Sequence, residues 1–187
     1  MSRPLPLEAN GCRVLRPSEF EALRSGVSDP QMATLLDALL YTGMRYVEAQ
    51  RFQWAGSKWW DGRQVVLPEE AVLKHERKQR SRYVHLNPRG LAAVSSFLRC
   101  PVRLPSWWTW TDWMKSWAKK GGVDPSKLGP KTTRKTWESW LMVTYPERWM
   151  HILLNQGHTA GTSVMHYLNI GFWDEDKAAM KPYVEGW

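Results

Sequence analysis

The chain has 187 residues, and its 26 Lys and Arg against 18 Asp and Glu give it a formal net charge of +8. An apolar share of 43% over this length supports one folded domain and excludes wholesale disorder. The longest apolar runs fall far short of the roughly 20 residues that cross a bilayer, and the N-terminus lacks the apolar segment of a signal peptide. We therefore expect an intracellular protein with no membrane partner, whose positive charge favours a polyanion, most often nucleic acid.

The sequence lacks the motifs of the common cofactor-dependent enzymes. It has no Gly-rich dinucleotide or NTP loop and no HExxH pair. The two cysteines, Cys12 and Cys100, form neither a disulfide framework nor a zinc knuckle. The five histidines lack the compact spacing of metal ligands. We expect neither a cofactor nor a metal site.

The N-terminal part of the chain predicts an arm followed by helices. Residues 1–16 contain Pro and Arg without a period, and we expect them to form an N-terminal arm outside the domain. A short helix is expected from Pro17, with Ser18 as its cap. A stronger helix follows, because Asp29 suits the cap position and Pro30 the first helical position. Its apolar stripe repeats at helical spacing through Met32, Leu35, Leu36, Leu39 and Leu40.

A change of period marks a small sheet in the middle of the chain. Gly43 ends or bends the preceding helix. Residues 64–68 and 83–86 have the composition of strands, and the strongly basic stretch 74–82 connects them, which predicts an antiparallel hairpin. Asn87 then caps the next helix.

The C-terminal half is expected to be helical. Apolar residues fall at helical spacing in 110–117, 131–144 and 146–157. We assign a stripe of five tryptophans to the hydrophobic core: Trp110, Trp113, Trp117, Trp137 and Trp140. The predicted fold class is therefore α+β and mainly α, with one small antiparallel β-sheet. We place the domain at 17–170 and a C-terminal tail with a helix of its own at 171–187.

Four short motifs of mostly polar residues follow one another along this chain. In order they are Thr42-Gly43-Met44-Arg45 with Glu48, the basic hairpin, Lys131-Thr132-Thr133-Arg134, and Gly157-His158 with Tyr167 nine residues after the histidine. Their order and local spacing resemble the catalytic domain of the tyrosine recombinases, the phage integrase family, from about residue 15 to the C-terminal end. Most members have His where this chain has Lys131, a variant that resembles the integrases of archaeal viruses and plasmids.

The resemblance implies a recombinase-like helical fold and a DNA strand transferase that works without ATP or metal. Its nucleophile would be Tyr167, whose phenol attacks a phosphodiester and forms a 3′-phosphotyrosyl bond. Arg45 and Arg134 would bind the phosphate oxygens, since guanidinium groups stay protonated and bind phosphate bidentately. His158 would donate to the same phosphate or help the phenol to lose its proton. Glu48 is expected to orient the Arg45 region or to stabilise the fold.

The resemblance also implies a lysine in the hairpin that protonates the leaving 5′-oxygen. Lys74 lies near the end of the first half of the hairpin, where the family lysine usually lies, and we prefer it to Lys78. Lys131 supplies positive charge at the position of the family histidine, but at ordinary pH an ammonium has no lone pair with which to accept a proton.

The implied partner is double-stranded DNA at a recombination site, bound by a homotetramer across two duplexes. The tail would dock on a neighbouring protomer through Phe172, Trp173, Tyr183 and Trp187. Most relatives carry an additional N-terminal domain, so this chain would be a fragment or a minimal enzyme. Two alternatives stay open. A type IB topoisomerase shares the tyrosine chemistry, and a DNA-binding regulator would keep the fold without catalysis.

Overall fold

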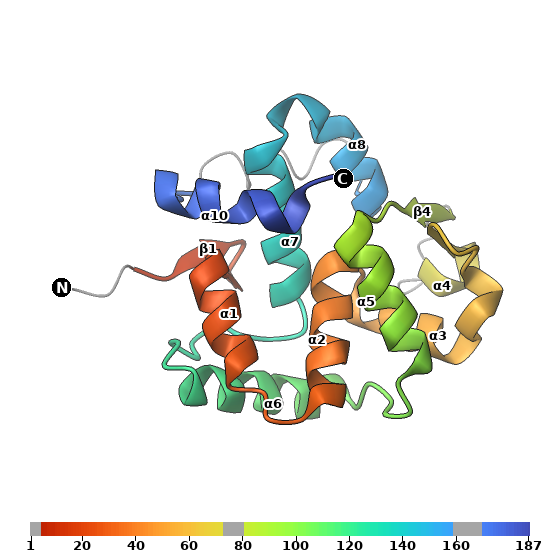
Figure 1. Ribbon diagram of the computed structural model, residues 1–187, viewed down its shortest axis with the longest axis horizontal. Coiled ribbons are helices and arrows are strands. Elements are labelled where there is room, and N and C mark those ends of the chain that lie inside the picture. The colour runs from red at the N-terminus through yellow and green to blue at the C-terminus, as the bar shows by residue number, and fades with distance from the viewer. Residues whose placement is uncertain (1–4, 73–80, 159–169) are drawn as a thin grey trace.

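The computed structural model describes residues 5–72, 81–158 and 170–187 (Figure 1). The α-helices are α1 (Pro17–Ser25), α2 (Pro30–Thr42), α3 (Tyr46–Ala55), α4 (Glu69–Val72), α5 (Pro88–Arg99), α6 (Trp107–Lys120), α7 (Thr132–Thr144), α8 (Trp149–Gln156) and α10 (Asp174–Val184). Two short 3-10 helices are η1 (Gly56–Trp59) and η2 (Pro146–Arg148). The strands are β1 (Leu7–Ala9), β2 (Cys12–Val14), β3 (Val65–Leu67) and β4 (Arg82–Val84). The predicted class, α+β and mainly α, is confirmed.

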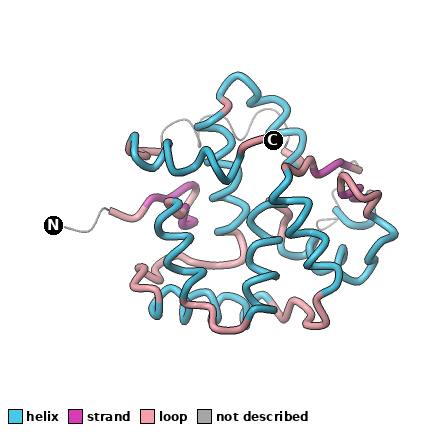
Figure 2. The backbone as a smooth tube through the Cα atoms, in the orientation of Figure 1, coloured by secondary structure: helices cyan, strands magenta, loops and turns pink. Residues whose placement is uncertain are grey.

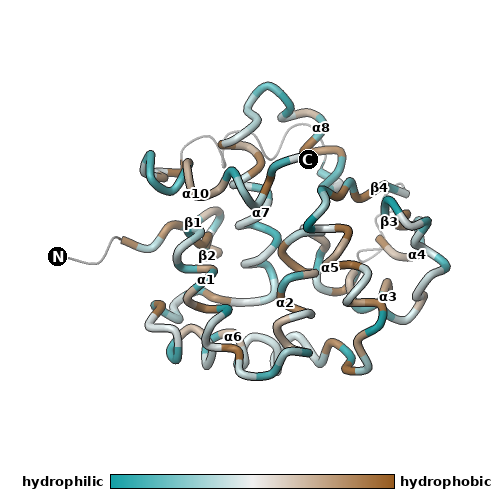
Figure 3. The backbone as a smooth tube through the Cα atoms, viewed as in Figure 1, coloured by the Kyte–Doolittle hydropathy of each residue, from teal (hydrophilic) through white to brown (hydrophobic). Residues whose placement is uncertain are grey.

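Helix α7 lies in the middle of the fold (Figure 1). It contacts α2, α10 and β2, while α1 packs on α6 and α2 packs on α5. The strands form two antiparallel hairpins, β1–β2 and β3–β4, on opposite sides of the molecule (Figure 2). Apolar and polar segments alternate along α5, as expected of a helix that buries one face (Figure 3). Helix α2 differs, because its C-terminal half is buried almost all round. Within the described ranges, no helix has both the length and the apolar character needed to cross a bilayer.

The starts of α2 and α5 and the pairing of β3 with β4 follow the sequence signals closely. The Asp29 carboxylate accepts the Gln31 backbone N–H at 2.8 Å at the start of α2. The Asn87 side chain likewise accepts the Gly90 N–H at 2.8 Å at the start of α5. Val65 of β3 lies opposite Val84 of β4 in the ladder. The two predicted caps and the predicted hairpin are therefore confirmed.

Tryptophan side chains fill the core around α7. Trp110, Trp137 and Trp140 are fully buried, and Trp117 is 7% exposed. The Trp140 indole N–H donates to the Leu15 carbonyl at 2.9 Å, so its polar edge is satisfied inside the core. The predicted core role of the tryptophan stripe is confirmed, with Trp113 packed against the core at its edge.

The N-terminal arm predicted for residues 1–16 is wrong for the described part of that range. Asn10 and Gly11 both have positive φ, 51° and 68°, and form the tight turn between β1 and β2. The Leu15 backbone N–H donates to Thr136 Oγ1 at 3.0 Å, which ties the segment to α7. The domain therefore includes this hairpin.

The start of α1 also differs from the prediction. Arg16, not Ser18, is the N-cap residue, and α1 begins at Pro17. The Glu19 carboxylate accepts the Arg16 backbone N–H at 2.9 Å and so satisfies the first turn. A carboxylate three residues into the helix thus replaces the expected serine cap.

The C-terminal tail packs against its own domain. Phe172, Tyr183 and Trp187 are buried, whereas Trp173 is 53% exposed. The Tyr183 hydroxyl donates to a Glu21 carboxylate oxygen at 2.6 Å. Three of the four aromatic residues expected to dock on a neighbouring protomer are therefore covered by the same chain.

Candidate active site

A tight turn between α2 and α3 places Arg45. Helix α2 ends at Thr42, and the φ of its C-cap residue Gly43, 55°, lies in the left-handed region that Gly adopts without strain. A Cβ at this position would lie 2.6 Å from Gln156 Nε2 and 2.9 Å from a Trp137 ring carbon, so only Gly fits. Arg45 follows as the N-cap residue of α3. The Thr-Gly-Met-Arg motif thus forms a turn that fixes the position of the Arg45 backbone.

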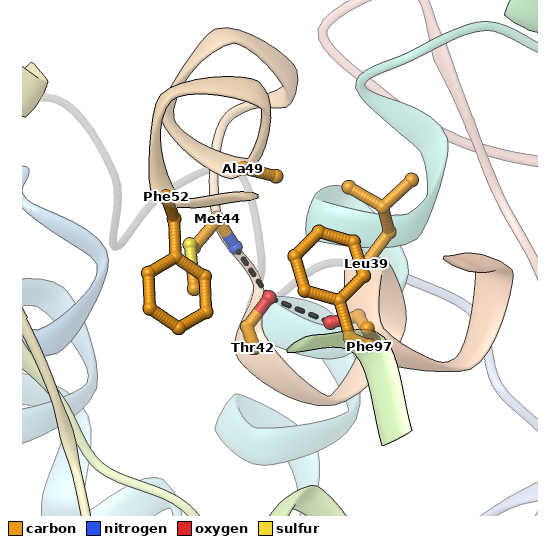
Figure 4. A pocket seen from close by; sticks show the side chains of 7 residues that line it. Leu39, Thr42, Met44, Ala49, Phe52 and Phe97 are labelled. Carbon is orange, nitrogen blue, oxygen red and sulfur yellow. Dashed lines mark hydrogen bonds between the residues drawn. The ribbon is translucent and has the colours of Figure 1, made fainter. Parts of the chain in front are cut away.

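Side chains beneath the turn hold it in place. Thr42 Oγ1 donates to the Ala38 carbonyl at 2.7 Å and accepts the Met44 N–H at 3.3 Å (Figure 4). Met44 then lies with Phe52 and Phe97 in an apolar pocket that leaves no room for a water molecule. This pocket is thus part of the packed core that supports the turn.

Arg45 links α3 to the end of α8. Its Nη1 donates to Glu48 Oε1 at 2.6 Å, and its Nη2 donates to the Gly157 carbonyl at 3.1 Å. Glu48 also accepts the Arg45 backbone N–H at 2.8 Å, which satisfies the first turn of α3. Because 22% of the Arg45 side chain is exposed, a ligand can reach it from solvent.

Arg134 reaches the same place from the first turn of α7. Its Nη1 donates to the Gly43 carbonyl at 2.8 Å, and its Nη2 donates to the Gln156 carbonyl. The same Nη2 lies 3.2 Å from His158 Nε2. Burial lowers the pKa of Arg134 to about 10, and the charges of two neighbouring arginines act in the same direction. The guanidinium therefore stays charged at neutral pH.

His158 lies between Arg134 and a buried carboxyl group. Its Nε2 is 2.9 Å from Glu138 Oε1, and Glu138 is fully buried one helical turn after Arg134 on α7. A guanidinium only donates hydrogen bonds and an ionised carboxylate only accepts them. A protonated Nε2 therefore donates a hydrogen bond to Glu138, whereas an unprotonated Nε2 accepts one from Arg134.

The sequence analysis missed Arg82 as a site residue. It is the last residue of the basic stretch 74–82 and the first residue of β4, and it is only 6% exposed. Its Nη2 donates to Glu48 Oε2 at 2.5 Å, and its Nη1 donates to the Asn155 carbonyl. Although burial raises the pKa of Glu48, the surrounding guanidiniums, that of Arg82 foremost, lower it below its usual value. Glu48 is therefore ionised at neutral pH.

Lys131 lies at the edge of the site. It is the N-cap residue of α7, three residues before Arg134, and its side chain is exposed. It is thus a surface cation beside the buried groups. The remaining predicted site residues, Lys74 with its alternative Lys78 and the nucleophile Tyr167, lie outside the residues that the structure describes.

Six residues form what we call the arginine cluster: Arg45, Glu48, Arg82, Arg134, Glu138 and His158. Three guanidiniums face two carboxyl groups, which leaves a net charge of +1 when both acids are ionised and the histidine is neutral. An excess of guanidinium groups suits an oxyanion such as phosphate. Among the residues that the structure describes, no group of three or more His, Cys, Asp or Glu is arranged to hold a metal ion.

Comparison with known proteins adds no assignment. No model of a protein family matches the chain, and a search of curated proteins gives no match. The function must therefore be argued from the site itself. What the site offers is positive charge gathered from separate segments of the chain around the end of α8.

Proposed function

We propose that the protein is a DNA strand transferase of the tyrosine recombinase type, a site-specific recombinase or integrase. The observation that carries the proposal is the convergence of Arg45, Arg134 and His158, which belong to three motifs far apart in the sequence. Arg134 Nη2 lies 3.2 Å from His158 Nε2, and Arg45 donates to the residue before His158 at 3.1 Å. Phosphoryl transfer without a metal needs such donors, because charge accumulates on the nonbridging oxygens in the transition state.

In the proposed reaction, the Tyr167 phenol loses its proton, with His158 as the candidate acceptor. The phenol oxygen attacks a backbone phosphorus, and the bond from phosphorus to the 5′-oxygen breaks. The leaving 5′-oxygen takes a proton from a hairpin lysine, Lys74 or Lys78, and the DNA keeps a 3′-phosphotyrosyl bond. A 5′-hydroxyl of the partner duplex then attacks this bond and releases the phenol. Because bond energy is conserved, the exchange uses neither ATP nor a cofactor. Lys131 adds a surface charge that draws the phosphate toward the cluster.

The proposed partner is double-stranded DNA, and the proposed assembly is a homotetramer that joins two duplexes. The formal charge of +8 supports a polyanionic partner. A type IB topoisomerase would use the same chemistry on one duplex. Relaxation of a supercoiled plasmid without strand exchange between two sites would assign that activity instead.

The burial of Arg134 favours a second, non-catalytic function. Arg134 is 5% exposed, and both of its Nη atoms donate to backbone carbonyls. A guanidinium used in this way stabilises a helix end whether or not a phosphate is present. A DNA-binding regulator built on this fold would bind duplex DNA and form no covalent bond.

A covalent trapping experiment tests the proposal. We expect the protein to form a protease-sensitive adduct with nicked duplexes from a random-sequence pool, seen as a shifted band on a denaturing gel. Tyr167→Phe should bind DNA and form no adduct. Arg45→Ala should slow adduct formation by about 100-fold or more, since removing one transition-state donor costs about 3 kcal/mol. Sequencing of the trapped strands would give the cleavage position.

Two results would contradict the proposal. The first is an adduct that persists in Tyr167→Phe, which would place the nucleophile elsewhere. The second is tight binding of duplex DNA by the wild-type protein with no adduct on any nicked substrate in the pool. The second result is the one expected of the DNA-binding regulator.

A further inference from the structure

The C-terminal turn of α8 is held by arginines from three different elements. Three consecutive backbone carbonyls each accept a hydrogen bond from a different guanidinium: Asn155 from Arg82, Gln156 from Arg134 and Gly157 from Arg45. The last carbonyls of a helix have no partner within the helix, and they carry its partial negative charge. Helix α8 ends at Gln156, and Gly157 is its left-handed C-cap residue. Arginines from β4, α7 and the N-cap of α3 therefore hold the end of this helix, directly before and at the residue that precedes His158.

Arg82 belongs to a closed ring of contacts around this helix end. Its Nη2 donates to Glu48 Oε2 at 2.5 Å, and Arg45 Nη1 donates to the other oxygen, Oε1, at 2.6 Å. Arg45 then returns to α8 by donating to the Gly157 carbonyl at 3.1 Å. The helical turn from Asn155 to Gly157 closes the ring. Each member is held from two sides, so a shift of Arg82 is transmitted to Arg45 and to the end of α8.

The side chain of Arg82 also packs against the backbone that leads to His158. Gly157 has a φ of 66°, and a Cβ there would lie 2.8 Å from Arg82 Cδ and 3.0 Å from Arg82 Nε. The absence of a side chain on Gly157 thus leaves the space that Arg82 occupies. With 6% exposure, Arg82 is placed to support the cluster from inside and not to meet a ligand from solvent.

We infer that Arg82 is a positioning residue of the strand-transfer site, acting through Glu48 and the end of α8 to fix Arg45 and His158 against the scissile phosphate. The inference rests on the proposed function. The planar guanidinium donates to a carboxylate and to a carbonyl at the same time, in a fixed fork. An ammonium keeps the charge but does not reproduce this fork, so Lys is not an equivalent residue at this position.

The experiment compares Arg82→Lys with Arg24→Lys. Arg24 is a matched control because it pairs with Asp37 through Nε at 2.7 Å and Nη2 at 2.7 Å on the exposed side of α1. We would measure duplex DNA affinity, the single-turnover rate of adduct formation on trapped DNA, and the NMR signals of the His158 ring. Arg82→Lys should slow adduct formation by about 10- to 100-fold, since small misplacements of catalytic groups have effects of this size. DNA affinity should stay unchanged and the His158 signals should move, while Arg24→Lys should change none of the three.

Each result bears on the inference separately from the proposed function. If Arg82→Lys forms the adduct at the wild-type rate and the His158 signals stay in place, the inference is wrong. If the wild-type protein forms no adduct at all, the proposed function fails. In that case the NMR signals of the His158 ring are the only readout. A shift of these signals in Arg82→Lys supports the positioning role, and unchanged signals overturn it. If Arg82→Lys does not fold, Glu48→Asp withdraws the carboxylate from the same contact, and the same readouts apply.

Discussion

Glu48 is fully buried between two guanidiniums, and each of its carboxylate oxygens accepts a hydrogen bond from one of them. The attraction inside a buried ion pair is largely offset by the loss of hydration. Removing one partner is different, because it leaves an uncompensated charge in the interior. Removing Glu48 should therefore cost more stability than the small net energy of either ion pair indicates.

We predict that Glu48→Gln lowers the free energy of unfolding by about 3–5 kcal/mol near neutral pH. The folded pKa of Glu48 lies below its ordinary value of 4.5, so its stabilising charge is fully present above that pH and is lost as the pH falls through the folded pKa. The difference from wild type should therefore narrow in acid. Urea denaturation of both proteins at about pH 7 and about pH 3 measures this.

The control for this prediction is Asp174→Asn. The Asp174 carboxylate pairs with Lys177 at 2.9 Å and its side chain is 94% exposed. An exposed pair of this kind is screened by water and contributes little to stability, so the variant should unfold like the wild type. A gap between wild type and Glu48→Gln that stays constant from neutral to acid pH would contradict the role of the Glu48 charge.

Local motifs predicted part of the arginine cluster and missed the rest. Arg45, Arg134 and His158 were found because each belongs to a short motif of fixed spacing. Arg82 was missed, although alternation along a strand puts it on the same face as the buried Val84. Glu138 lies four residues after Arg134 on one helix face and was also missed. Whether a charged residue is buried depends on partners far away in the sequence, and local motifs in a single sequence do not show which residues those are.

Helices and strands were predicted correctly where residues within a few positions determine them. The caps of α2 and α5 are set by side chains within three residues of the helix start. The β1–β2 hairpin was missed although Asn10-Gly11 is a strong turn signal. All four strands have three residues, but β1 and β2 contain one β-branched residue, Val14, and no aromatic one. Strands β3 and β4 contain three valines and Tyr83, the composition that predicts a strand. The position of α10 was beyond prediction, because it depends on contacts with α7 and α1.

Helix α10 leads to a prediction about the tail. Ending the chain at Ile170 should leave it unfolded or without fixed tertiary packing. The tail buries Phe172, Met180, Tyr183, Val184 and Trp187. Each such side chain contributes about 1.5–3 kcal/mol, and together they match the whole stability of a typical domain. Near-ultraviolet circular dichroism measures the tertiary packing of the truncated chain, and thermal unfolding measures its stability.

The matched control for the truncation is Trp173→Ala. Trp173 is half-exposed, and the Arg16 guanidinium lies 5.1 Å from its ring centroid. Losing an exposed contact of this kind costs about 0.5–1 kcal/mol. If the truncated chain instead keeps native stability and loses only self-association, the tail acts on a neighbouring protomer, as the resemblance implies.

At the scale of the whole molecule, most of the positive charge lies outside the arginine cluster. The cluster contributes +1 with its acids ionised, whereas the chain carries +8. Charges that exceed their local partners produce the long-range field that attracts a polyanion. If the proposed DNA partner is right, exposed cations such as Lys131 should supply most of the attraction toward it, and the buried network should shape the site.

Lys131 provides this test, because it is exposed three residues before Arg134 and none of the described ion pairs includes it. Duplex affinity should fall linearly with the logarithm of salt concentration, with a slope of about −0.9 for each phosphate contact. We predict that Lys131→Ala makes this slope shallower by about 1 without changing the thermal stability. Fluorescence anisotropy across a salt series measures the slope. Lys177→Ala, which removes a cation already paired with Asp174 at 2.9 Å on α10, should keep the wild-type slope. An unchanged slope in Lys131→Ala would mean that no phosphate reaches the N-terminus of α7, and the DNA would then have to approach the cluster from the side of Arg45.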